Sequence, residues 1–96
     1  CCGHTHTPRL LRSQRGQLLL NPGSVGLPAY GDTLPWPHAV ENGAPDARYA
    51  IAERGADGRW SAELLAVPYD HEAMAVLAEQ RARPEWAHAL RWGRLP

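Results

Sequence analysis

The sequence predicts a mixed α/β chain of the α+β type, with short strands, one β-hairpin and two C-terminal helices. Three observations support this class. Residues 48–67 alternate between apolar and polar side chains around a turn signal, which predicts a hairpin. Residues after 70 place apolar side chains at helical spacing. A length of 96 residues allows one small domain, so these elements should share it.

The first strands of the predicted fold are short. We expect Cys1–Gly3 to be the last step of a buried strand, followed by a turn that begins at Gly3. Pro8 should prevent regular structure from continuing beyond this turn. The apolar run Gln17–Asn21 has the length of a second buried strand, and Pro22 ends it.

A long loop is predicted from Pro22 to about Asp46. Five prolines and four glycines interrupt this stretch, and no strand or helix period survives in it. Loops of this length are uncommon in small domains and are usually functional or disordered. Tyr30 and Trp36 lie within the loop and favour its docking onto a surface.

The hairpin is expected from Arg48–Glu53 and Trp60–Val67. In the first segment Tyr49 and Ile51 would share one face, and in the second segment Trp60 begins a row of apolar residues on one face. The intervening stretch contains Asp57–Gly58, a dipeptide typical of tight turns. These features together predict two paired antiparallel strands.

Two helices should complete the chain. Asp70 is a plausible N-cap for the first helix, which should extend to about Arg81. Pro84 should occupy the first position of the second helix, where its missing N–H costs nothing. Gly93 is placed to end that helix.

Charge and composition exclude several classes of function. Ten arginines balance ten acidic residues, which argues against nucleic acid as a general ligand. No apolar run reaches the roughly 18 residues of a membrane-spanning helix, so we expect no membrane association. The only cysteines, Cys1 and Cys2, are adjacent and unsuited to a disulfide framework, which favours a reduced, cytoplasmic protein.

His4 and His6 are the sharpest candidates for chemistry. Two histidines separated by one residue point to the same side only where the backbone is extended. Neutral imidazole is the commonest metal ligand in proteins. The pattern therefore indicates metal binding, and the alternative is two solvated histidines near a mobile terminus.

The segment Asn21–Gly26 is the second candidate. Its glycines permit positive φ and close approach of other backbone, which a turn at the end of a strand would explain. Alternatively the loop lines a site and offers backbone N–H groups or the Ser24 hydroxyl to an anion. His38 is either a substrate contact or a solvated loop residue, and the same choice holds for the arginines that follow the histidines: Arg9, Arg12 and Arg15.

Together, GHTH at residues 3–6 and NPGSVG at residues 21–26 resemble the C-terminal part of calcineurin-like metallophosphoesterases, especially small bacterial phosphodiesterase-type members. The VPYD segment at residues 67–70 and the tail from Pro84 to Arg94 are similar to the same family. The resemblance covers essentially the whole chain but well under half of a complete family domain.

The resemblance implies a four-layer α-β-β-α sandwich that holds two divalent metal ions, which in this chain would be Mn, Fe, Zn or Ni. It assigns His4 to one ion and His6 to the other. The implied reaction is hydrolysis of a phosphoester substrate, in which a metal-bridging hydroxide attacks phosphorus.

The chain departs from this family because the DxH and GNH motifs do not occur, and Gly31–Asp32 follows GHTH instead of preceding it. We therefore expect residues 1–96 to be a single partial domain, the C-terminal segment of a larger enzyme, and to be inactive alone. Its expected partner is the missing N-terminal half of the domain or a second copy. The alternative function is a non-catalytic β-rich interaction or oligomerisation module.

Overall fold

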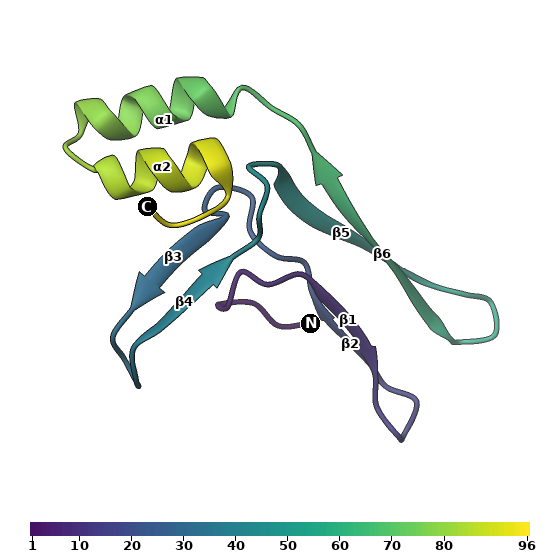
Figure 1. Ribbon diagram of the computed structural model, residues 1–96. Coiled ribbons are helices and arrows are strands. Elements are labelled where there is room, and N and C mark those ends of the chain that lie inside the picture. Colours follow the sequence, from purple (N-terminus) through teal and green to yellow (C-terminus); the bar gives the residue numbers. More distant parts are fainter.

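The structure is a computed structural model that describes residues 1–96, and it confirms the α+β class. Three separate antiparallel hairpins, each a two-stranded sheet, accompany two helices (Figure 1). The helices lie side by side at one end of the molecule, and the hairpins spread away from them (Figure 1). The resulting shape is elongated, with extents of 51 × 32 × 18 Å.

The first hairpin pairs β1 (Arg9–Arg12) with β2 (Leu18–Asn21). The second of these strands was predicted, but the expected strand at Cys1–Gly3 is wrong. Cys1 and Cys2 are exposed, and the backbone N–H of Cys2 donates a single hydrogen bond of 2.8 Å to the carbonyl of Leu20. One such bond forms no ladder, and β1 supplies the strand partner instead.

The second hairpin corrects the predicted loop at residues 22–46. Here β3 (Ala29–Asp32) pairs with β4 (His38–Glu41). Each strand has four residues and directly follows a proline, Pro28 or Pro37. A proline at a strand boundary does not interrupt the ladder, but strands this short show no readable alternation. The density of proline and glycine therefore concealed a real hairpin.

The third hairpin is confirmed, with β5 at Ala47–Arg54 and β6 at Trp60–Val67. Its turn contains Gly58 at φ +80°, a conformation that glycine adopts freely. The hairpin projects from the rest of the molecule (Figure 1). Much of its apolar surface faces solvent, and Ile51 remains 53% exposed.

The helices begin and end as predicted. The first, α1 (His71–Gln80), is capped by Asp70, whose carboxylate accepts a hydrogen bond of 3.1 Å from the N–H of Ala73. The second, α2 (Pro84–Trp92), starts with proline. It ends at Gly93, which has the left-handed conformation (φ +65°) typical of a helix C-terminus.

The core is small and lies between the two helices. Its largest buried cluster contains three alanines and one leucine: Ala75, Ala78, Ala87 and Leu90. Only ten of the 96 residues are buried. The C-terminal end of α2 is joined to the second hairpin, because the N–H of Gly43 donates to the carbonyl of Gly93 and the N–H of Leu95 donates to Glu41. This connection places β3 and β4 beneath α2 (Figure 1).

Candidate functional site

His4 and His6 lie in a tight loop rather than on extended backbone. Both adopt left-handed conformations, with φ of +73° and +59°. Such values are uncommon outside glycine, although histidine tolerates them better than β-branched residues do. Both side chains nevertheless line one open cleft of about 600 Å³. A turn therefore directs both predicted ligands into one cleft, whereas the sequence pattern indicated that extended backbone would do so.

The imidazole of His6 is held by the proline- and glycine-rich segment. Its Nδ1 donates a hydrogen bond of 3.0 Å to the carbonyl oxygen of Leu27. A carbonyl only accepts, so Nδ1 carries the proton and Nε2 keeps a free lone pair. The ring of Tyr30 packs edge-on against it, with the ring centroids 5.0 Å apart. Metal-binding histidines are commonly oriented by such a bond at the second ring nitrogen.

Asn21 joins the two sequence motifs directly. Its side-chain amide donates a hydrogen bond of 2.9 Å to Oγ1 of Thr5, and its carbonyl oxygen accepts one of 3.1 Å from the N–H of Gly23. Asn21 is only 6% exposed. On the other side of the loop, Asn42 donates to the carbonyl of His6 at 3.0 Å. Two asparagines therefore hold the histidine loop from β2 and from the end of β4.

The Asn21–Gly26 segment requires glycine at one position. Gly23 has φ +89°, and a Cβ atom placed there would lie 2.9 Å from Cβ of Arg48. Gly26 faces open space. The Oγ of Ser24 accepts a hydrogen bond from the N–H of Leu27, which stabilises the turn that holds His6. The predicted close approach is thus confirmed at Gly23.

The second hairpin forms the opposite wall of the cleft. His38, which the sequence left open as a substrate contact or a solvated residue, lines the cleft beside Tyr30 and Asp32. Nδ1 of His38 donates to the carbonyl of Trp36 at 2.7 Å. The cleft therefore gathers three imidazoles, two from the GHTH loop and one from β4.

Asp32 lines the cleft, although the sequence argument had set it aside because Gly31–Asp32 follows GHTH. Its Oδ1 accepts hydrogen bonds from the backbone N–H groups of Leu34 and Thr33, and these bonds hold the pKa of the carboxyl below its usual value. The nearby His38 and His4 lower the pKa further. The carboxylate therefore stays ionised at neutral pH. The Asp-Thr sequence after a glycine was the available signal, because aspartate often closes a turn in this way.

The two predicted metal ligands, His4 and His6, line the same cleft. The Nε2 atom of His6 is a free donor, and the exposed His4 lines the same cleft. No group of three or more His, Cys, Asp or Glu side chains converges closely enough to hold a metal ion. A stable site needs more protein ligands than these two. The structure therefore places two histidines of one motif in the same cleft and shows no complete group of metal ligands.

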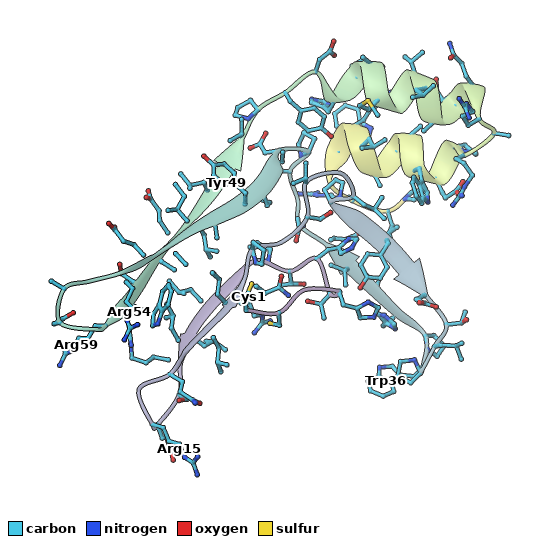
Figure 2. All side chains as sticks on the ribbon, turned by 180° about the vertical axis from the view of Figure 1, so that it is seen from behind. Cys1, Arg15, Trp36, Tyr49, Arg54 and Arg59 are labelled. Carbon is cyan, nitrogen blue, oxygen red and sulfur yellow. The ribbon has the colours of Figure 1, made fainter.

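The arginines after the GHTH motif do not enter this cleft. Arg12 donates to the carbonyls of Gly16 and Trp60, and Arg15 lies at the tip of the first hairpin (Figure 2). Both line a different cleft, between the tips of the first and third hairpins. The structure thus separates these two arginines from the histidines.

Comparison with known proteins identified no relative of this chain. No protein-family model matches this chain, and no curated protein or solved structure matches it either. Neither helix has the length and apolar composition needed to cross a membrane.

Proposed function

We propose that this chain is the C-terminal part of a metal-dependent phosphoesterase, in which His4 and His6 supply one ligand each to a pair of divalent ions. The two helices and the hairpins would be part of a four-layer α-β-β-α sandwich completed by another segment. The observation that carries the proposal is the hydrogen bond from His6 Nδ1 to the carbonyl of Leu27, which ties the GHTH loop to the residue directly after the NPGSVG segment and leaves Nε2 free.

The residues of this chain would position the reacting groups. Leu27 fixes the proton of His6 on Nδ1, and Asn21 and Asn42 hold the loop in its turned conformation. Divalent ions, when bound, supply a nucleophile at neutral pH and offset charge on the phosphoryl group. The ionised Asp32 adds one negative charge at the cleft wall, close to His4 and His38.

The remaining ligands must come from outside these 96 residues. Large apolar side chains such as Leu11 and Ile51 are exposed on the hairpins, and the total exposed surface is also large for a chain of this length. The chain exposes 6839 Å², whereas a compact protein of this length exposes about 5,500 Å². Its radius of gyration is 15.6 Å, against about 12.5 Å for a compact domain. Another segment that packs against the first and third hairpins would bury much of this surface and bring acidic ligands to the cleft.

Titration of the full chain with Mn²⁺ tests the ligand assignment. Paramagnetic line broadening should first affect the imidazole NMR signals of His4 and His6. His4→Ala and His6→Ala should each weaken this binding, while His88→Ala, on α2 and outside the cleft, should leave it unchanged. Equal broadening of all five histidines, or binding that survives both cleft substitutions, would contradict the proposal.

The second candidate function is a non-catalytic interaction or oligomerisation module. The same exposed apolar surface favours it, especially on the third hairpin, since an isolated two-stranded hairpin is only marginally stable in water. Sedimentation velocity and metal analysis on one sample separate the two candidates. Self-association without bound metal, and without any effect of His4→Ala or His6→Ala, favours the module.

A further inference from the structure

We infer that the β3–β4 hairpin is a recognition arm, which selects phosphoesters that carry a planar aromatic group. In this assignment His38 contacts the anionic phosphoryl group and Trp36 stacks on the aromatic group. The inference deepens the proposed function, because it concerns the substrate of the same cleft. It rests on the register of the hairpin, on the orientation of His38 and on the exposure of Trp36.

The register places the relevant side chains on one face of the hairpin. Asp32 pairs with His38 across the strands, and Tyr30 pairs with Val40. Cross-strand partners share a face, and residues two apart on a strand also share it. All four residues line the cleft that contains His4 and His6. This face of the hairpin is therefore directed toward the histidine loop.

Two contacts hold this face against the loop. The hydroxyl of Tyr30 donates to the carbonyl of Thr5 at 3.4 Å, and the ring of Tyr30 lies between two imidazoles. Its centroid is 5.0 Å from that of His6 and 6.2 Å from that of His38. Tyr30 thus acts as a spacer that sets how far His38 stands from the proposed metal ligands.

His38 is oriented in the same way as His6, by a hydrogen bond from Nδ1 to a backbone carbonyl. Nδ1 of His38 donates to the carbonyl of Trp36, so Nε2 is the ring nitrogen available to a ligand. When protonated, Nε2 would donate a charge-assisted hydrogen bond to a phosphoryl oxygen. A backbone carbonyl from the hairpin tip therefore positions the imidazole, and the tip also carries the aromatic side chain.

Trp36 stands at the tip of the arm (Figure 2) and lines the rim of the cleft. Its side chain is 67% exposed, so the indole covers no core and remains available for stacking. Aromatic side chains bind planar rings through their faces, and this stacking tolerates different ring types. A cleft that holds three imidazoles and the Asp32 carboxylate, with an exposed indole at its rim, suits a phosphoester with an aryl or heterocyclic group.

Binding of two non-hydrolysable anions to the full chain, without metal, tests the arm. We expect phenylphosphonate to bind about fivefold or more tightly than methylphosphonate. Trp36→Ala should abolish this preference, whereas Trp92→Ala, which removes an exposed tryptophan outside the cleft, should preserve it. His38→Gln should weaken both phosphonates by a similar factor, and His88→Gln should weaken neither.

Equal affinities for the two phosphonates, or a preference that survives Trp36→Ala, would overturn the inference. Unchanged binding in His38→Gln would also overturn it. These outcomes are distinct from failure of the proposed function, which the Mn²⁺ titration of His4 and His6 decides. Dispersed amide NMR spectra of each variant establish that the substitutions leave the fold intact.

Discussion

The side-chain amide of Asn21 donates a hydrogen bond to Oγ1 of Thr5 at 2.9 Å, across 16 residues of sequence. Thr5 is the central residue between the two histidines, and Asn21 is the last residue of β2. The conformation of the histidine loop therefore depends on an adjacent strand. The contacts of Asn21, Gly23, Gly93 and Arg91, which hold this loop and the helices in place, can each be tested by substitution.

Asn21→Ala should destabilise the chain by about 1–3 kcal/mol, because it removes three hydrogen bonds of a buried side chain. The histidine loop should loosen, so Mn²⁺ should bind more weakly at His6. Urea unfolding and the Mn²⁺ titration measure the two effects. Gln14→Ala, in the exposed turn of the first hairpin, is the control. Similar unfolding midpoints for both variants would contradict the role of Asn21.

Gly23→Ala should also destabilise the chain, by about 1–3 kcal/mol. The added methyl group would occupy a residue at φ +89° and lie 2.9 Å from Cβ of Arg48. Gly26→Ala is a matched control from the same loop, because its Cβ meets nothing within 4 Å. Thermal unfolding of both variants gives the comparison. Equal melting temperatures would show that the packing of Gly23 against Arg48 is not restrictive.

Gly93→Ala should separate the C-terminal end of α2 from the second hairpin. A Cβ at Gly93 would collide with the backbone of Ala44, and the residue has φ +65°. We expect a loss of about 2 kcal/mol or more, with exposure of the amide N–H of Gly43. The rate of hydrogen exchange at the Gly43 amide measures whether its hydrogen bond to Gly93 is lost. Arg94→Ala, at the exposed neighbouring position, should retain slow exchange; equally fast exchange in both variants would be inconsistent with the prediction.

Stability should depend on pH through Arg91. Its guanidinium donates to Glu72 on the facing helix, and this hydrogen bond is the main cause that lowers the pKa of Glu72 below 4.5. A hydrogen bond from Arg91 lowers the pKa of Glu79 below 4.5 in the same way. A depressed carboxyl pKa in the folded state stabilises it above the unfolded value, and this contribution is lost as pH falls through the folded value.

The melting temperature of the wild type should therefore decrease as pH falls below about 4.5. Arg91→Gln should melt at a lower temperature at pH 7. Its melting temperature should also decrease less on acidification, because Glu72 and Glu79 no longer have a pKa lowered by Arg91. Arg81→Gln, which removes an arginine without an ion pair, is the control. If the melting temperatures of wild type and Arg91→Gln change in parallel with pH, Arg91 is not the source of the pH dependence.

Local sequence signals predicted the elements whose boundaries are chemically marked. Asp70 caps α1, and Gly93 ends α2 in the left-handed conformation, as their residue types indicated. The third hairpin has eight residues in each strand, long enough for alternation to be visible. The second hairpin escaped prediction because its four-residue strands lie among prolines.

The candidate site was predictable only in part. His4 and His6 were identified from the motif, but the left-handed backbone that brings them to one cleft was not. Asp32 and His38 meet through strand pairing between residues that seemed to belong to a loop. Such a contact depends on register, and register cannot be read where the strands themselves are not recognised.

The spread of the hairpins has a consequence for how long the chain survives in the presence of proteases. Arg15, Arg54 and Arg59 lie at the projecting tips of the first and third hairpins, where solvent reaches them freely (Figure 2). Exposed loop tips are preferred points of proteolytic cleavage. A trypsin-like protease should therefore cut the free polypeptide first at these tips, and a partner that covers them would also protect the chain from degradation.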